Sequence, residues 1–235
     1  GNHVNARALE SKTDRIFQTF RFGLFVGPTF NRLKPTASSA DGYHVTEGPV
    51  HTGFSFGIVA DYNVNERYTL FTGAGIDWRG GRIQVEHDSS VVSADDLKVA
   101  RVNYKKMQYL SVPLGLKMKA FETGAYKVFA QTGFDFGLLL SQKGDYTMTT
   151  ATDSVMKGTN EKLGGKATVV PFNIGWSIGI GTEYQVGDKN AFFFSLLYRN
   201  GFIDATSPNN NNKGWHFSDG NIRSNAILLR VGYFF

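Results

Sequence analysis

The sequence predicts an all-β protein: an eight-stranded antiparallel transmembrane up-and-down β-barrel with periplasmic N- and C-termini and four long extracellular loops. Two observations support this prediction. Apolar residues alternate with small or polar residues in eight separate runs, which is the period of a β-strand with two different faces. Short and long connections also alternate between the runs, as in barrels of the bacterial outer membrane.

The first four runs establish the pattern. The run at 20–31 sets phenylalanine, leucine and valine against mainly glycine, threonine and asparagine. At 52–64, phenylalanine, isoleucine and tyrosine oppose glycine, serine and aspartate. The runs at 68–79 and 109–119 likewise oppose large apolar residues to glycine, serine and charged residues. Each run therefore predicts one strand with an apolar face and a small or polar face.

The remaining four runs repeat it up to the end of the sequence. Those at 128–141 and 172–184 alternate phenylalanine, leucine, isoleucine and tryptophan with glycine, aspartate and serine. Those at 192–199 and 227–235 place phenylalanine, leucine and tyrosine on one face and include an arginine on the other. The sequence ends on the terminal phenylalanine of the eighth run, which we expect to close the last strand.

The connections give the strand count a second time. Short turns are predicted near residues 65, 123 and 188, whereas long polar segments cover 33–50, 80–106, 142–168 and 203–222. Three short turns and four long loops require eight strands when both termini lie on the short-turn side. Val85 and Val99 predict that the third and fourth strands extend above the membrane as a hairpin.

A soluble barrel of the lipocalin type would also show a period of two. Its large apolar residues would fill the interior, and small interior residues would leave voids. Here the glycine, serine and charge face has too little apolar volume to make a packed core, so we expect the other face to contact lipid. Aromatic residues near both ends of the runs, such as Tyr62, Tyr184, Trp78 and Tyr198, predict girdles at the two headgroup levels.

Composition excludes several classes of protein. The 235 residues include no cysteine, which excludes disulfides and thiolate sites, and no apolar run long enough for a membrane helix. The net charge of +5 comes from basic residues scattered among acidic ones, so we expect no nucleic acid partner. No signal peptide is visible at the start. We divide the sequence into an N-terminal periplasmic segment, 1–19, and an outer-membrane barrel domain, 20–235.

Charged residues on the inner face fall into two tiers, and each tier mixes both signs. The tier nearer the short turns contains Asp61, Lys117, Glu183 and Arg230. The tier farther in contains Asp77, Arg79, Asp135 and Arg199. An eight-stranded barrel is only wide enough for side chains, so we expect ion-pair networks that plug the lumen. The alternative is a carboxylate pair, Asp77 with Asp135, that performs acid and base catalysis.

Other catalytic signals are weaker. No histidine pair has the spacing of a zinc motif, although His51, at the mouth of the second strand, leaves open a loop-borne site with serine or aspartate. Glycine series such as Gly175, Gly179 and Gly181 lie inside strands and do not open a helix, so they do not predict a nucleotide loop. We expect these glycines to make room for bulky phenylalanines in the interior. No cofactor and no metal is expected.

Three segments resemble the PorT-like family of Bacteroidetes outer-membrane β-barrel proteins: FGLFVGPTF at 22–30, YLSVPLGLK at 109–117 and LLRVGYFF at 228–235. The Tyr-Leu-x-x-Pro-Leu element is the most characteristic. The terminal aromatic residue resembles the signal that delivers barrels to the insertion machinery. The resemblance implies an eight-stranded outer-membrane barrel, and its founding member is associated with type IX protein secretion. None of the three segments contains a catalytic residue.

We therefore expect a non-enzymatic protein of the bacterial outer membrane with a side-chain-plugged lumen. Its expected role is that of an assembly or scaffold component, with type IX secretion as the candidate machinery. Expected partners are outer-membrane lipid, lipopolysaccharide, and other outer-membrane or periplasmic proteins. One alternative is a surface adhesion or ligand-binding barrel that acts through its extracellular loops. The other is a lipid-modifying barrel enzyme.

Overall fold

The structure is a computed structural model. It describes residues 20–35, 39–40, 43–87, 97–150, 155–161, 167–169, 172–188, 190–201, 206–208 and 222–235. The predicted periplasmic segment, 1–19, lies outside these residues. Within them, no helix is long and apolar enough to cross a membrane.

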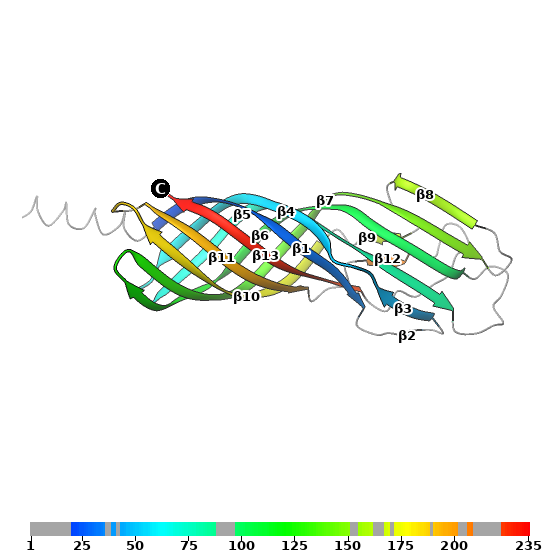
Figure 1. Ribbon diagram of the computed structural model, residues 1–235, viewed down its shortest axis with the longest axis horizontal. Helices are drawn as coiled ribbons and strands as arrows, with labels where there is room; N and C mark the ends of the chain where they lie inside the picture. The colour runs from blue at the N-terminus through cyan, green and yellow to red at the C-terminus, as the bar shows by residue number, and fades with distance from the viewer. Residues whose placement is uncertain are drawn as a thin grey trace, which may run out of the picture.

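Eight antiparallel strands form a closed barrel (Figure 1). They are β1 (Phe20–Pro35), β4 (His51–Asn63), β5 (Tyr68–His87), β6 (Leu97–Thr123), β7 (Tyr126–Thr150), β10 (Phe172–Gln185), β11 (Ala191–Gly201) and β13 (Ile222–Phe234). Each strand pairs with the next of these strands along the chain. The last strand, β13, returns to pair with β1, with Gly23 opposite Phe234, so the barrel has no free edge. The predicted fold is thus confirmed.

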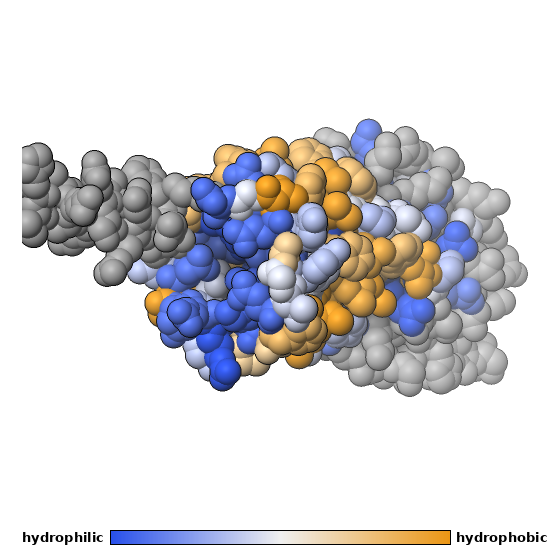
Figure 2. All heavy atoms as spheres, turned by 60° about the vertical axis from the view of Figure 1, so that its left-hand side comes forward, coloured by the Kyte–Doolittle hydropathy of each residue, from blue (hydrophilic) through white to orange (hydrophobic). Residues whose placement is uncertain are grey.

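The two faces of the strands point as the alternation predicted. Neighbouring residues on one strand show this: Leu196 is 41% exposed, whereas Leu197 is 3% exposed. The outward apolar residues form a band around the barrel, and polar residues gather at the end where the short turns lie (Figure 2). Phe54, Leu114 and Ile178 belong to this band and are about half exposed. Such a band matches the surface that acyl chains require.

The short-turn end is tightly built. Between β4 and β5, the backbone N–H of Val64 donates to Tyr68 O at 3.0 Å, and between β10 and β11 that of Val186 donates to Asn190 O at 2.9 Å. Gly124 forms the β6–β7 turn with a φ of 60°, a left-handed conformation that glycine adopts at no steric cost. These are the three predicted short turns.

The strands extend farther at the long-loop end than the sequence predicted. The predicted hairpin is present, because β5 and β6 remain paired from Gly81 opposite Tyr104 to Glu86 opposite Val99. The segments 33–50 and 142–168, expected as polar loops, contain strand instead. Short strands occur here in addition: β2 (Ser39–Ala40), β3 (Tyr43–Glu47), β8 (Val155–Glu161), β9 (Ala167–Val169) and β12 (Thr206–Pro208). Of these, β3 pairs with β5 and β8 with β7, which widens the sheet beyond the barrel.

Aromatic pairs mark both ends of the apolar band. At the short-turn end the ring centroids of Phe20 and Tyr62 lie 4.8 Å apart, and those of Tyr126 and Tyr184 lie 4.9 Å apart. Toward the other end, the ring centroids of Trp176 and Tyr198 lie 6.2 Å apart in an edge-on arrangement. These rings stand where the predicted girdles should lie.

Candidate functional site

An aromatic layer fills the lumen toward its short-turn end. Its members are the buried residues Phe25, Phe71, Phe129, Phe193 and Phe234. Glycines on the inner face make room for these rings: a Cβ atom added at Gly115 would meet Phe71, one at Gly181 would meet Phe129, and one at Gly232 would meet Phe193. This is the packing role that the sequence predicted for inward glycines.

A first ion-pair network, which we call the mouth network, lies on the short-turn side of this layer. Asp61 is 1% exposed and binds two cations, Lys117 Nζ at 2.9 Å and Arg21 Nη2 at 3.3 Å. Arg21 Nη2 also donates to Glu183 Oε1 at 2.6 Å, and Lys127 Nζ lies 3.9 Å from Glu183 Oε2. Of the predicted first tier, Asp61, Lys117 and Glu183 therefore come together, joined by Arg21 and Lys127.

Lys117 connects the mouth network to the aromatic layer. Its ammonium lies 5.0 Å from the ring centroid of Phe129 and 5.2 Å from that of Phe234, with Phe71 and Phe193 at about 6 Å. Cation–π attraction and the Asp61 carboxylate together offset the loss of hydration of this cation. The arrangement blocks the centre of the barrel.

A second network, which we call the inner network, lies beyond the aromatic layer and is almost completely buried. Asp77 Oδ2 accepts from Arg79 Nε at 2.8 Å and from Arg199 Nη1 at 2.6 Å. Asp135 accepts from Arg79 Nη2 at 3.3 Å and from Ser111 Oγ at 2.9 Å. All four charged residues of the predicted second tier meet here.

Arg230 does not join the tier to which the sequence assigned it. It faces the lumen, but its guanidinium carbon lies 4.4 Å from the ring centroid of Phe25. Its main electrostatic partners are Asp135, Asp77 and Arg199 of the inner network, and it makes no ion pair with any residue that the structure describes. The long arginine side chain explains the difference, because its charge need not lie at the level of its own Cα atom.

Arg21 and Lys127 are the members of the mouth network that the sequence analysis did not single out. Arg21 is the second residue of β1, and Lys127 is the second residue of β7, directly after a short turn. Arg21 on β1 meets Glu183 on β10 only because the barrel closes with these two residues at the same end. The alternation within one run does not show how the strands are aligned with one another.

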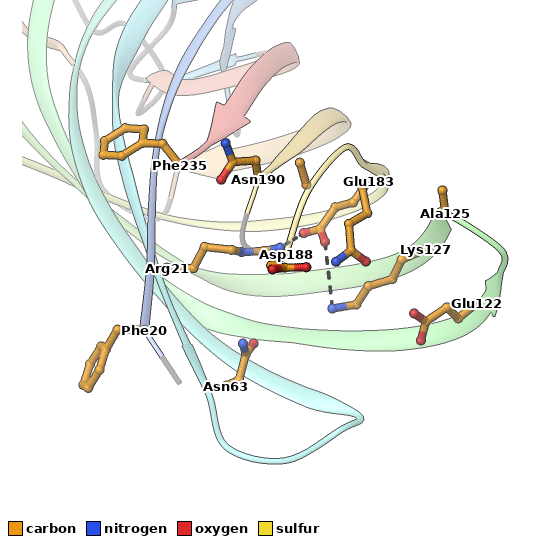
Figure 3. A pocket seen from close by; sticks show the side chains of 12 residues that line it. Phe20, Arg21, Asn63, Glu122, Ala125, Lys127, Glu183, Asp188, Asn190 and Phe235 are labelled. Atoms are coloured by element: carbon orange, nitrogen blue, oxygen red, sulfur yellow. Dashed lines mark hydrogen bonds and ion pairs between the residues drawn. The ribbon is translucent and has the colours of Figure 1, made fainter. Parts of the chain in front are cut away.

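A pocket of about 280 Å³ opens at the short-turn end, at the entrance to the mouth network (Figure 3). Arg21 and Lys127 reach from β1 and β7 toward Glu183 of β10 at its floor. Glu122 lines one side of the pocket, and Phe20 and Phe235 lie on the other side; Asp188 also lines it. A hydrogen bond from Lys119 at 3.0 Å lowers the pKa of Glu122, which therefore remains ionised at neutral pH.

The carboxylate pair proposed for acid and base chemistry is committed to other contacts. Asp77 and Asp135 both form ion pairs with guanidinium groups inside the lumen. His51 begins β4, where its carbonyl accepts a hydrogen bond from Asn31 Nδ2 at 3.3 Å. Among the described residues, no group of three or more histidine or acidic side chains is arranged to hold a metal ion.

A closed antiparallel barrel with an outward apolar band, aromatic girdles and a polar, side-chain-filled interior defines an outer-membrane β-barrel. Residues 9–207 match the family model described as the outer membrane protein beta-barrel domain. The chain belongs to this family, and its location is the bacterial outer membrane.

Comparison with solved structures finds other outer-membrane proteins at low identity. Ail of Yersinia pestis is 13% identical, with a TM-score of 0.37, over 92% of this chain and 99% of Ail. OprG of Pseudomonas aeruginosa is 12% identical, with a TM-score of 0.42, over 92% of this chain and 94% of OprG. The protease OmpT of Escherichia coli is 10% identical, with a TM-score of 0.43, over 92% of this chain and 95% of OmpT. No curated protein matches the sequence.

Proposed function

We propose that this outer-membrane barrel is a non-enzymatic assembly or scaffold component that acts through its periplasmic mouth. The filled lumen is the observation on which the proposal depends. The mouth network, the aromatic layer and the inner network occupy successive levels of an interior that is wide enough only for side chains. A barrel without a water-filled channel acts through its ends.

The mouth pocket supports the choice of the periplasmic end. It is large enough to take several side chains of a protein partner, and its rim carries charged and amide groups outside the membrane. Glu183 is held at its floor by two cations, so the pocket keeps a defined shape before a partner arrives. Pre-formed pockets reduce the entropic cost of association.

Crosslinking from the mouth tests this role. A photo-crosslinking amino acid at Ala125, on the pocket wall, should capture specific periplasmic or outer-membrane proteins in living cells. The same amino acid at Leu114, in the lipid-facing band, is the matched control and should capture none of them. Equal products from both positions, or none from Ala125, would contradict a scaffold role for the mouth.

The resemblance of the segments at 22–30, 109–117 and 228–235 to PorT-like proteins suggests type IX secretion in a Bacteroidetes-type cell as the particular machinery. Components of that secretion system should then be among the proteins crosslinked from Ala125. A deletion strain should retain type IX substrates inside the cell. Normal secretion in that strain would leave a scaffold role in another assembly.

The widened sheet at the long-loop end favours a second candidate, a surface barrel for adhesion or ligand binding. Strands β5, β6 and β7 continue beyond the barrel and are joined by β3 and β8. A rigid extracellular sheet is a suitable platform for recognition. Ligand-dependent protection of residues 81–86 from hydrogen exchange would support this role in place of the first.

The lipid-modifying enzyme is the third and least supported alternative, because the carboxylates of the lumen are bound by arginines. Mass spectrometry of lipid A and phospholipids from a deletion strain tests it. An unchanged lipid profile is expected, and the loss of a modified lipid species would identify an enzyme.

A further inference from the structure

The inner network carries more positive than negative charge. Together with Arg230, it brings the guanidinium groups of Arg79, Arg199 and Arg230 near only two carboxylates, those of Asp77 and Asp135. Three cations against two anions leave one excess positive charge in the described part of this chamber. A charge that is removed from water needs a compensating partner.

The two carboxylates are already occupied. Asp77 Oδ2 binds both Arg79 and Arg199, and Asp135 binds Arg79 and the hydroxyl of Ser111. Arg230 therefore makes no direct ion pair with a described carboxylate: Asp135 and Asp77 attract it only at longer range, and Arg199 repels it. Its closest printed contact is the face of the Phe25 ring, 4.4 Å from the guanidinium carbon. The ring supplies only part of the electrostatic stabilisation that a carboxylate would give to the guanidinium.

Hydrogen-bond donors without a protein partner accumulate in the same chamber. Buried atoms of this kind are Nε and Nη2 of Arg199 and Nε of Arg230. Two buried unpaired atoms in this part of the lumen can only accept, Asp77 Oδ1 and Asn31 Oδ1, while the Ser55 hydroxyl can donate or accept. Of the two acceptors, only Asp77 belongs to a residue that lines the cavity beside Arg230. A surplus of donors calls for a ligand that only accepts.

A small cavity lies directly beside Arg230. Its volume is about 10 Å³, and its wall includes Arg230, Ser55, Asp77, Ser111 and Phe25. This is room for one species of about the size of a water molecule. Three of the unpaired atoms belong to residues on this wall: Arg230 Nε, Ser55 Oγ and Asp77 Oδ1.

We propose that this chamber binds one small monovalent anion, chloride in the cell, beside the guanidinium of Arg230. Ser55 donates a second hydrogen bond, and Arg199 contributes its charge. Asp77 Oδ1 is the one acceptor that the anion faces, and the carboxylate to which it belongs is already shared by two arginines. The anion balances the excess cation, and polyatomic anions such as sulfate are too large for the cavity. This inference does not depend on the proposed scaffold role.

Bromide crystallography locates the ion. Crystals of the full refolded chain grown in sodium bromide should give an anomalous peak in contact with the Arg230 guanidinium. A water molecule at this place, donating to Asp77 Oδ1 and without anomalous signal, would overturn the proposal. An empty chamber would overturn it as well.

Thermal unfolding tests the site in solution. The midpoint of the wild-type protein should be several degrees higher in sodium chloride than in sodium gluconate at equal ionic strength. Arg230→Met removes the excess cation and should abolish the difference, whereas Arg230→Lys should keep it. Arg67→Met, in an exposed short turn, is the matched control and should also keep it. Equal wild-type midpoints in the two salts would refute the site, and this result does not require any variant to fold.

Discussion

Arg199 Nη1 lies 2.6 Å from Asp77 Oδ2, although the two residues are 122 positions apart in the chain. The contact joins β11 to β5, which are not neighbours in the barrel, so it crosses the lumen. Both side chains are at most 3% exposed. The interior is therefore braced by ion pairs between opposite walls, and removal of one partner should affect the whole barrel.

We predict that Arg199→Met lowers the free energy of unfolding by about 3–5 kcal/mol, because it breaks a buried ion pair with Asp77 that joins two strands across the lumen. Equilibrium urea unfolding in lipid vesicles measures this. Lys119→Met is the matched control: it removes the exposed ion pair with Glu122, and the expected loss is at most about 1 kcal/mol. Similar losses in the two variants would contradict a bracing role for Arg199.

Gly232→Ala should destabilise the barrel by about 1–3 kcal/mol, since the new Cβ atom would overlap the Phe193 ring of the aromatic layer. Thermal unfolding in detergent provides the measurement. At Gly187, in a short turn, the nearest atom to an added Cβ is 3.6 Å away, so Gly187→Ala should leave the midpoint almost unchanged. An unaffected Gly232→Ala variant would mean that the ring does not lie against this glycine.

Leu114→Arg should lower the free energy of unfolding by about 2–4 kcal/mol. Leu114 is 55% exposed near the middle of the apolar band, where a charged side chain must enter the hydrocarbon of the membrane. Val64→Arg is a control of similar exposure in a short turn, where the cost should be about 1 kcal/mol or less. Equilibrium urea unfolding in lipid vesicles measures the free energy of unfolding of both variants. A smaller loss for Leu114→Arg than for Val64→Arg would place the band outside the membrane.

The filled lumen predicts that the wild-type barrel inserts into planar bilayers without conductance steps. The rings of the aromatic layer and the Lys117 ammonium among them leave no path for hydrated ions. The combined variant Phe129→Ala and Phe193→Ala removes two rings and should produce small, brief openings. Stable openings of the wild-type protein would contradict the closed interior.

Strand direction and face could be predicted from the sequence because one face contacts lipid and the other fills a narrow interior. Leu196 and Leu197 illustrate this: the alternation of the run at 192–199 placed them on opposite faces, and their exposures agree. The inward glycines were also predictable, since the large rings of Phe129 and Phe193 need small neighbours in so narrow a space.

Three features could not be predicted from the sequence. The position of the Arg230 guanidinium along the barrel axis depends on how its long side chain is oriented. The place of Arg230 in its strand does not determine that orientation. The extension of β7 to Thr150 and the added strand β8 lie beyond the membrane, where neither face needs to be apolar and the alternation loses its signal. Arg21 and Lys127 were missed for a related reason, because their partners lie on other strands.

The orientation of the two faces is the central claim, and adjacent leucines test it directly. In protein with labelled methyl groups, a spin-labelled lipid should broaden the methyl signals of Leu196, which is 41% exposed, and spare those of Leu197, which is 3% exposed. The reverse pattern, or equal broadening of both residues, would contradict a barrel whose apolar face contacts lipid and whose polar face lines a filled lumen.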